Sequence, residues 1–584
     1  MNDDILSQVM KPGRYIGREW NVPQKDFDKT PVKFALCFPD LYEVGMSNLG
    51  LRIIYDILNK IPDVSCERFF SPALDMENIL RSRCREVFSL ETGRIMRDFD
   101  LAGFSLGYEL CYTNVLNMLD LSGIPLKSEM RGQTHPLIIA GGPCALNPEP
   151  MHGFFDLFVI GEAEEAIVQI TDAYGKHKEK FRSGRMSKEE LLAILSNIEG
   201  VYAPALYETE YAAGGGIISF GPKVGGIPRK VKKRFVRDLD NASFPVDWLV
   251  PYIETIHDRI SLEIMRGCPN QCRFCQARHQ YYPMRKRSAD NIFNLALQAY
   301  GRSGYEEISL GGLSVSDYPG IEKVVESLIG SFKEKGVSIS LPSIKPRAIV
   351  GELSPLIASI KKTGLTFAPE AASEKLRRIL NKDFDIDEFF KVLEKSYLCG
   401  YNRVKLYFMT GLPLETDSDL DAIADLANRA SQARRSMNLA SAWVNVSVNT
   451  LVPKPHTAFQ WFKMQDLEGM QCAERYLKNK IHNRKIEINF HNSRMSFMEG
   501  VLSRGDRRLG EVILRAFTKG ARFDAWESHF SFNLWMEAFR ESGVDPDFYL
   551  AAKSTDEILP WDFLDMGVDK NFLKEEFNKC IAMG

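Results

Sequence analysis

The sequence predicts an α/β protein, and three stretches of it carry that prediction. Between residues 31 and 175, short apolar segments alternate with amphipathic helical ones, which indicates a doubly wound parallel sheet of the Rossmann or flavodoxin type. A second alternation over 251–455 indicates a partial (β/α)6 TIM-like barrel. From 456 to 584 the pattern is mostly helical and rich in aromatic residues. We therefore expect two α/β domains followed by a helical C-terminal extension.

The composition is that of a folded protein of balanced charge. The chain has 584 residues, of which 45% are hydrophobic and 26% charged, and its formal net charge is −3. These values exclude a mostly disordered chain and a protein that coats nucleic acid by charge alone. No apolar run reaches the ~18 residues that cross a bilayer, and the polar lead at 1–30 shows no signal-peptide pattern. We expect a cytoplasmic protein with no membrane partner.

The predicted N-terminal sheet should gather its functional groups at one edge. Its five strand-like segments span 33–39, 67–72, 100–107, 136–142 and 156–162. Helical periodicity follows four of them, over 46–60, 75–84, 108–122 and 163–175. The carboxyl ends of parallel strands meet at one edge, where such sheets bind ligands. That edge would carry the segments Pro39–Gly45, Ser105–Gly107, Gly141–Pro143 and Gly161–Glu162.

Residues 176–250 interrupt the alternation and are interpreted as a connector with some antiparallel strand. Six of the nine residues in 229–237 are basic: Arg229, Lys230, Lys232, Lys233, Arg234 and Arg237. Two interpretations of this run stay open. It contacts RNA or another polyanion, or it is a solvated edge strand, which lysine suits.

The second domain, 251–455, contains six strand-like segments with helical segments between most of them. These segments span 259–267, 306–312, 337–342, 365–370, 403–411 and 442–453. A parallel barrel places its chemistry at the carboxyl ends of its strands. The helical extension from 456 would cover the mouth of this barrel.

A cysteine-rich loop, RGCPNQCRFCQ at 266–276, follows the first of these strands. Cys268, Cys272 and Cys275 have the spacing C-x3-C-x2-C. Three thiolates so close together can hold three irons of a 4Fe-4S cluster and leave the fourth iron open. The alternative is a structural zinc site, with His279 as a fourth ligand.

This loop resembles the motif of the radical SAM superfamily, in which an aromatic residue, here Phe274, precedes the last cysteine. The resemblance implies a 4Fe-4S cluster and S-adenosylmethionine as cofactors. It also implies that the backbone of Gly311 and Gly312 contacts the methionine amino group and that Glu370 orients the cofactor. The segment MTGLPLET (409–416) resembles the fifth-strand motif of the family, with Leu414 where glycine is common.

The N-terminal edge resembles cobalamin-binding sheets, which carry D-x-H-x-x-G, S-x-L and Gly-Gly at successive strand ends. The matching residues, with the family's Gly-Glu-x-Glu segment included, are Asp40, Tyr42, Gly45, Ser105, Gly141, Gly142 and Glu162. Tyr42 stands where the cobalt-ligating histidine would be. The resemblance implies a cobalamin without imidazole ligation from the protein. The alternative is a sheet that has lost cobalamin.

Together these resemblances imply an enzyme that cleaves S-adenosylmethionine reductively to a 5′-deoxyadenosyl radical. With cobalamin it would methylate an unactivated carbon, and it would need an electron donor such as flavodoxin or ferredoxin. Another radical reaction, such as rearrangement or sulfur insertion, is the alternative within this class. A non-catalytic zinc- or RNA-binding protein is the alternative outside it. The sequence leaves RNA, a peptide and a small metabolite open as substrates.

Overall fold

The structure is a computed structural model that describes residues 3–341 and 365–583. Its N-terminal sheet has six strands in the order β2-β1-β3-β4-β5-β6. They are β1 Val32–Phe38, β2 Val64–Phe70, β3 Leu101–Ser105, β4 Leu137–Gly141, β5 Leu157–Val159 and β6 Val201–Tyr202. The first five run parallel and β6 is antiparallel to β5. This order puts the topological switch point between β1 and β3, where sheets of this kind bind ligands.

Helices cover the N-terminal sheet in the way that the sequence predicts. The helices that follow the first and last parallel strands, α3 (Leu49–Lys60) and α6 (Glu164–Arg182), pack against each other. Helix α5 (Tyr112–Leu121) packs instead against α17 (Leu509–Thr518) of the C-terminal region. The prediction of an α/β protein with a parallel N-terminal sheet is confirmed.

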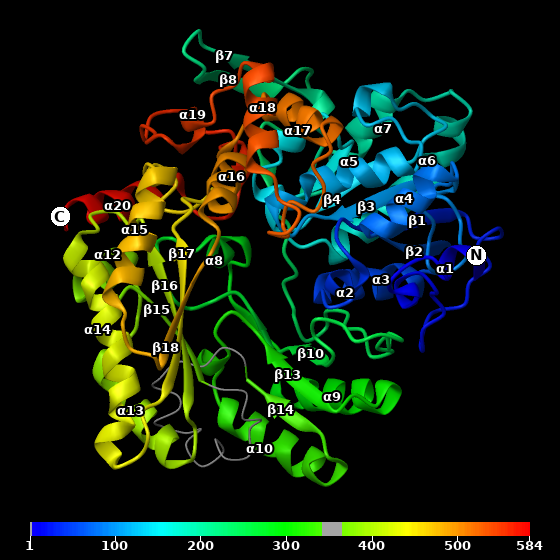
Figure 1. Cartoon of the computed structure of the whole chain (residues 1–584). Coiled ribbons are helices and arrows are strands. Elements are labelled where there is room, and N and C mark those ends of the chain that lie inside the picture. Colours follow the sequence, from blue (N-terminus) through cyan, green and yellow to red (C-terminus); the bar gives the residue numbers. More distant parts are fainter. Residues whose placement is uncertain (1–2, 342–364, 584) are drawn as a thin grey trace.

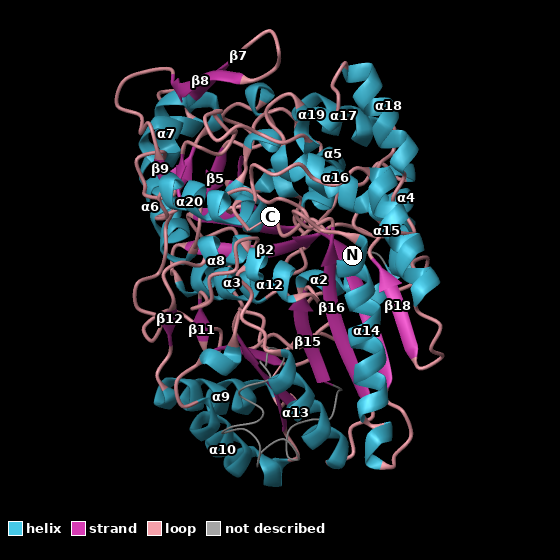
Figure 2. Cartoon of the chain, turned by 90° about the vertical axis from the view of Figure 1, so that its left-hand side faces the viewer, coloured by secondary structure: helices cyan, strands magenta, loops and turns pink. Residues whose placement is uncertain are grey.

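The second half contains two further parallel sheets, and Figure 1 shows them below the N-terminal sheet. One consists of β10 (Ile260–Glu263), β13 (Glu307–Gly311) and β14 (Ser338–Ser340), and the other of β15 (Leu365–Glu370), β16 (Arg403–Thr410), β17 (Trp443–Thr450) and β18 (Ile486–Phe490). One face of the second sheet packs on a buried core. Alternate apolar residues form this face, among them Val444, Val446 and Val448. Helices α13 (Ile386–Leu398) and α14 (Asp417–Ala433) lie along that sheet (Figure 2).

Two details of this half differ from the sequence prediction. Within the described residues the seven strands form two sheets and not one continuous barrel. Strand β18 lies inside the region predicted to be helical, where it pairs in parallel with β17. Its apolar residues alternate with Glu487 and Asn489, and this short period-two pattern is masked by the helices on either side. The end of the predicted strand 337–342 and the helix expected after it fall outside the described residues.

The C-terminal region packs on both α/β parts. It contributes α15 (Leu467–Lys480), α16 (Ser493–Arg504), α17, α18 (Phe532–Ser542) and α20 (Lys570–Ile581). The Lys454 ammonium, just after β17, lies 2.7 Å from Glu109 Oε1, which follows β3, and 2.9 Å from Glu499 Oε1 on α16. The three charged groups are mostly buried, so this ion cluster joins all three parts of the chain. No helix in the described ranges is long and apolar enough to span a membrane.

The basic run at 229–237 is not a uniform solvated edge. Lys232 is exposed and pairs with Glu199, whereas Lys233 is 3% exposed. The Lys233 ammonium donates to the carbonyl oxygens of His279 (2.8 Å) and Tyr282 (2.7 Å), and burial lowers its pKa to about 8. Arg234 pairs with Glu165. Part of the run therefore holds the cysteine loop in place, which neither interpretation of the sequence included.

An ion network joins the N-terminal sheet to the start of the second half. The Glu162 carboxylate accepts hydrogen bonds from Arg266, Arg285 and the backbone N–H of Val236, all at 2.8 Å. Glu164 adds a second ion pair to Arg266 at 2.6 Å. Burial alone would raise the pKa of Glu162, but the hydrogen bonds from Arg285 and the charge of Arg266 lower it. The side chains of Glu162 and Arg266 are 4% and 8% exposed, so water screens this network weakly.

We expect Glu162→Ala to lower the stability of the whole protein. The change leaves Arg266 and Arg285 buried without their shared carboxylate, and breaking a buried pair in this way costs about 3–5 kcal/mol. Urea or thermal unfolding measures the loss. Glu165→Ala is the matched control, because Glu165 is half exposed and its pair with Arg234 contributes about 1 kcal/mol at most. Equal unfolding midpoints for the two variants would contradict the network's role.

Lys233→Ala should destabilise the protein by about 2–4 kcal/mol, because two buried carbonyls lose a charged donor. Lys232→Ala, one residue away and exposed, should change stability by less than about 1 kcal/mol. Differential scanning calorimetry of both variants checks this. If Lys233→Ala unfolds at the wild-type temperature, the contacts to His279 and Tyr282 do not hold the loop.

Candidate functional site

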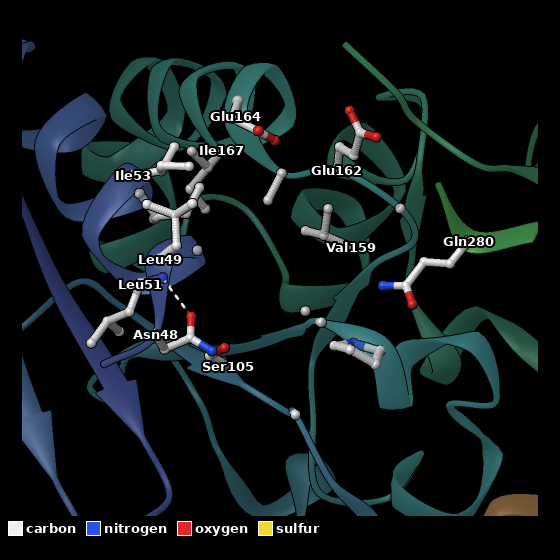
Figure 3. Close-up of a pocket in the computed structure, with 18 of the residues that line it drawn as sticks. Asn48, Leu49, Leu51, Ile53, Ser105, Val159, Glu162, Glu164, Ile167 and Gln280 are labelled. Atoms are coloured by element: carbon white, nitrogen blue, oxygen red, sulfur yellow. Dashed lines mark hydrogen bonds between the residues drawn. The ribbon is translucent and has the colours of Figure 1, made fainter. Parts of the chain in front are cut away.

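A cavity of about 630 Å³ lies between the N-terminal sheet and the start of the second half. The sheet contributes residues at the carboxyl ends of β3, β4 and β5 and from the middle of β1, and the helices contribute residues from the N-terminal parts of α3 and α6. The second half closes the cavity with Glu263, Met265, Gly267, Gln280, Tyr281 and Gly312. Figure 3 shows Asn48, Ser105, Val159 and Gln280 around this space. The cavity therefore lies at the edge that the sequence indicates for β3, β4 and β5, whereas the predicted segment Pro39–Gly45 after β1 does not line it.

The inner part of the cavity is an apolar slot between one face of the sheet and the helices α3 and α6. Its sheet wall consists of alternate strand residues, which all project from the same face. The lining of the slot is Phe34, Leu36, Gly103, Ile139 and Val159 from the strands and Ile53, Ile54 and Ile167 from the helices. Phe34 lies four residues before the end of β1, so the slot reaches about 13 Å down the strand. Such a slot fits a long, flat and apolar group.

Glycines keep the mouth of the cavity open. Gly107 lines it, and a Cβ built there would meet no atom within 4 Å. Gly141 also lines it with only ordinary contacts to Val159. At Gly142 the backbone itself requires glycine. Its φ is +104°, and a Cβ there would lie 2.7 Å from the Leu106 carbonyl oxygen. The backbone turn after β4 therefore requires glycine even without a ligand.

Ser105, Gly141, Gly142 and Glu162 line the cavity, as the resemblance to cobalamin-binding sheets implies. The Glu162 carboxylate is already engaged by two arginines and a backbone N–H. This residue therefore shapes the cavity wall and ties the two halves together, and nothing in its contacts leaves it free for a cofactor. Among the described residues Ser105 has no such partner, and it lines the cavity at the end of β3.

Asp40, Tyr42 and Gly45 lie outside this cavity. The Tyr42 hydroxyl donates to Glu19 at 2.9 Å, and burial raises the pKa of Tyr42. Asp40 accepts from the indole N–H of Trp526 at 2.9 Å, and a Cβ at Gly45 would lie 2.3 Å from the Phe70 ring. The residues of the D-x-Y-x-x-G segment thus pack against other parts of the chain, and Tyr42 is not among the residues that line the cavity.

The cysteine loop is closed at its base by a short antiparallel pair, β11 (Met265–Arg266) and β12 (Arg285–Lys286). Gly267 begins the loop with φ +89°, and a Cβ there would lie 2.7 Å from the backbone of Tyr281 and of Met284. Cys275 caps helix α8 (Gln276–Gln280), which leads back toward the cavity. The loop therefore starts at the wall of the cavity and extends from there into the second half of the chain.

Arg273 anchors the loop from the opposite side. Its guanidinium donates to the carbonyls of Arg378 and Ile379 at the end of α12 (Glu374–Leu380) and pairs with Glu576 on α20 at 2.7 Å. A cation at a helix C-terminus is stabilised by the helix dipole. Phe274 packs in the apolar cluster formed by α12 and α20. Phe274 therefore has a packing role that accounts for an aromatic residue before the last cysteine.

The three thiols have the surroundings that a cluster needs. All three cysteines are partly exposed. Burial raises the pKa of Cys272 to about 11 and also raises that of Cys275, while the charge of Lys382 lowers both. A bound metal deprotonates such thiols. Three thiols from one anchored loop, with a lysine beside them, fit the protein side of a cluster whose fourth iron has no protein ligand.

The side chains of the loop are not gathered into a metal site of either kind. The described residues contain no group of three or more His, Cys, Asp or Glu that could hold a metal ion, and this covers the three cysteines as well as His279. The charged neighbours of His279 are Arg278, His456 and Lys233, and burial lowers its pKa to about 3. The imidazole is therefore neutral at pH 7, and Lys233 of the connector binds the backbone carbonyl oxygen of the same residue.

The residues assigned to S-adenosylmethionine lie at strand ends around the loop. Gly311 ends β13 and Gly312 borders the cavity, where a Cβ would lie 2.7 Å from Met265. Glu370 ends β15 with φ +64° and its carboxylate lies 3.2 Å from Lys382, the lysine beside the thiols. Burial raises the pKa of Glu370. Leu414 takes φ +63°, the conformation that explains why glycine is common at this position.

Sequence reasoning missed several residues of the site. Gln280 and Tyr281 line the cavity from α8 and the residue after it, and Arg266 lines it and pairs with Glu164 of the predicted Gly-Glu-x-Glu segment. The segment HQYY (279–282), so close behind the third cysteine, is a signal that could have found the first two. Nothing local in the sequence marks the ion pairs, because their partners are about 100 residues apart.

Comparison with known families gives two matches on this chain. Residues 50–204 match the model described as radical SAM proteins, N-terminal. Residues 262–427 match the model of the radical SAM superfamily, which includes the cysteine loop and the strand ends described above. The two segments together span more than half of the 584 residues.

Similar proteins include an uncharacterised protein of Methanocaldococcus jannaschii, 26% identical over 511 residues, which cover 87% of this chain and 97% of that protein. A tRNA-2-methylthio-N(6)-dimethylallyladenosine synthase of Petrotoga mobilis is 21% identical over 55% of this chain and 75% of its own length. Among solved structures, the radical S-adenosylmethionine methyltransferase TsrM of Kitasatospora setae, with cobalamin and a 4Fe-4S cluster bound, aligns with a TM-score of 0.44. It is 11% identical, over 71% of this chain and 72% of that one. With both of its matched segments carrying the predicted motifs, the chain is an enzyme that belongs to the radical SAM superfamily.

Proposed function

We propose that this radical SAM enzyme holds cobalamin in the inter-domain cavity and methylates an unactivated carbon of its substrate. When bound, the 4Fe-4S cluster would supply the electron that cleaves S-adenosylmethionine to a 5′-deoxyadenosyl radical, and cobalamin would supply a methyl carrier. The single observation that carries the proposal is the apolar slot. It reaches about 13 Å between the sheet and α3 and α6, and its mouth faces the ends of β10 and β13. A flat ring at that mouth with the flat benzimidazole base of its tail in the slot fits this shape.

The chain's own residues have separable tasks in this proposal. Cys268, Cys272 and Cys275 would bind the cluster, and the charge of Lys382 opposes the effect of burial on the pKa of Cys272 and Cys275. Glu370 and the backbone of Gly311 and Gly312 would orient S-adenosylmethionine at the strand ends. The C-terminal helices would exclude water, which otherwise quenches a radical. None of these tasks depends on Asp40, Tyr42 or Gly45.

A second candidate function is methylthio transfer, which the tRNA-modifying relatives favour. In that reaction sulfur must be supplied, and a second cluster is one source. The other eight cysteines of this sequence stand singly, so the chain offers no second motif of this kind. Methyl transfer therefore fits the chain better, and RNA, a peptide and a small metabolite stay open as substrates.

Reductive cleavage needs one electron from outside the chain. We propose a small electron-transfer protein of the flavodoxin or ferredoxin type as the donor, and a cytoplasmic location for the reaction. Cys268 and its neighbour Asn270, whose amide lies 3.2 Å from the Cys268 sulfur, are both partly exposed. Electrons would have a short path to the cluster from this side of the loop.

Cys272→Ala should remove most of the bound iron and abolish cleavage of S-adenosylmethionine, because it deletes the only protein ligand of one iron. Iron and sulfide analysis after anaerobic reconstitution, with detection of 5′-deoxyadenosine, measures both effects. Cys399→Ala is the matched control, since Cys399 is exposed and far along the chain from the loop. Normal iron in the Cys272 variant would show that the cluster assignment is wrong.

Gly107→Leu should block the cavity without disturbing the fold. No atom lies within 4 Å of a Cβ at Gly107 and its φ is not positive, so a leucine fits the chain and fills the mouth. We expect wild type to bind hydroxocobalamin and the variant to bind it at least about tenfold more weakly, at an unchanged unfolding temperature. Absorbance titration and equilibrium dialysis measure the binding.

Gly132→Leu provides the control for this experiment, because Gly132 is equally open but lies outside the cavity. Equal cobalamin binding by the Gly107 and Gly132 variants would contradict the assignment of the ligand to this cavity. A wild-type protein that binds no corrinoid would overturn the cobalamin proposal itself.

A further inference from the structure

Gln280 is a largely buried residue whose side-chain amide pairs with no other residue in the described ranges. It ends α8, is 6% exposed and lines the cavity. Within the described part of the chain its side-chain amide makes no hydrogen bond. Figure 3 shows this amide projecting into the cavity from the side opposite α3. A buried amide is normally hydrogen-bonded, so an unpaired one aimed into a cavity indicates a ligand that completes it.

The backbone that carries Gln280 is held in place from several sides. The Lys233 ammonium binds the carbonyl oxygens of His279 and Tyr282, the residues on either side of the Gln280–Tyr281 pair. Arg285 donates to the Tyr281 carbonyl at 3.0 Å. The amide is therefore presented by a fixed segment, and its direction is a property of the fold.

The charged groups around this part of the cavity balance one another. Glu162, Glu164 and Glu263 line it. Arg266 and Arg285 pair with these carboxylates, and the Lys233 ammonium lies on the backbone that carries Gln280. A ligand group that approaches Gln280 therefore meets a neutral amide, which pairs fully with a group that both donates and accepts hydrogen bonds, whereas a carboxylate can only accept.

We infer that Gln280 pairs with a peripheral carboxamide of a corrinoid and so selects amidated corrinoids over forms that carry free carboxylates. The inference rests on the proposed binding of cobalamin in this cavity. A corrin ring carries primary amides around its edge, and each offers one acceptor and two donors, as the amide of Gln280 does. Gln280 is a specificity-determining residue for the ligand, contributed by the loop that also carries the cysteines.

The test uses the full chain and two ligands, hydroxocobalamin and its monocarboxylic acids, in which one side-chain amide is hydrolysed. Wild type should bind hydroxocobalamin about tenfold more tightly than at least one monocarboxylic acid isomer. Gln280→Met keeps the length of the side chain and removes both polar atoms. It should weaken hydroxocobalamin binding about tenfold and abolish the preference. Absorbance titration, confirmed by equilibrium dialysis, measures both affinities.

Gln276→Ala is the control on the same helix, because Gln276 donates to the Pro455 carbonyl and does not line the cavity. It should leave both affinities unchanged. Gln280→Met should not lower the unfolding temperature, since it removes a buried amide that has no partner. A purely structural role would give the opposite pattern, with a lower unfolding temperature and wild-type affinity.

If wild type binds hydroxocobalamin and Gln280→Met binds both ligands as wild type does, the inference is overturned and the proposed cobalamin site stands. If wild type binds no corrinoid, the proposed site fails and this inference fails with it. Gln280→Glu, which keeps the shape but loses the donors, serves if the methionine variant does not fold. It should also lose about tenfold in affinity for hydroxocobalamin.

Discussion

The buried pairing of Glu162 with Arg266 and Arg285 is the interaction on which the site depends. Glu162 follows β5 of the N-terminal sheet. Its partners Arg266 and Arg285 lie on the two short strands, β11 and β12, that close the base of the cysteine loop. One carboxylate thus fixes both ends of the loop against the edge of the sheet. Charges at this depth are costly to bury and are tolerated only when they are paired with good geometry. The cavity, the thiols and α8 all take their positions from this contact.

The cysteine loop is supported from the other side by the far end of the sequence. Arg273 reaches the end of α12 and the Glu576 carboxylate on α20, and Cys580 of that helix packs in the same apolar cluster as Phe274. A loop that must hold a cluster gains rigidity from these contacts, because each one restricts a backbone that would otherwise be mobile. The C-terminal region is therefore part of the site's support, in addition to its expected place over the barrel mouth.

The sequence predicts local features of this protein well and distant ones poorly. The cysteine spacing, the Gly-Gly turn after β13 and the alternation of the first five strands are each contained in a few neighbouring residues. Glu162 matches a family position and Tyr42 occupies one where histidine is expected, but the partner of Tyr42 is Glu19 and those of Glu162 are Arg266 and Arg285. Such partners are set by tertiary packing and leave no local signal. The roles of Lys233 and Gln280 could not be predicted for the same reason. Strand β18 was not predicted because its five weakly alternating residues lie between two helices.

Helix α8 has a consequence for how this chain can change over evolution. It lies between Cys275, its N-cap, and Gln280, its last residue, so it spaces the proposed cluster ligand about 8 Å from the cavity wall. Inserting one residue would lengthen it by about 1.5 Å and turn Gln280 by about 100° away from the cavity. Point substitutions in this segment preserve the spacing between Cys275 and Gln280, whereas insertions and deletions change it. The length of the segment from Cys275 to Gln280 should therefore vary less among descendants of this chain than its residues do.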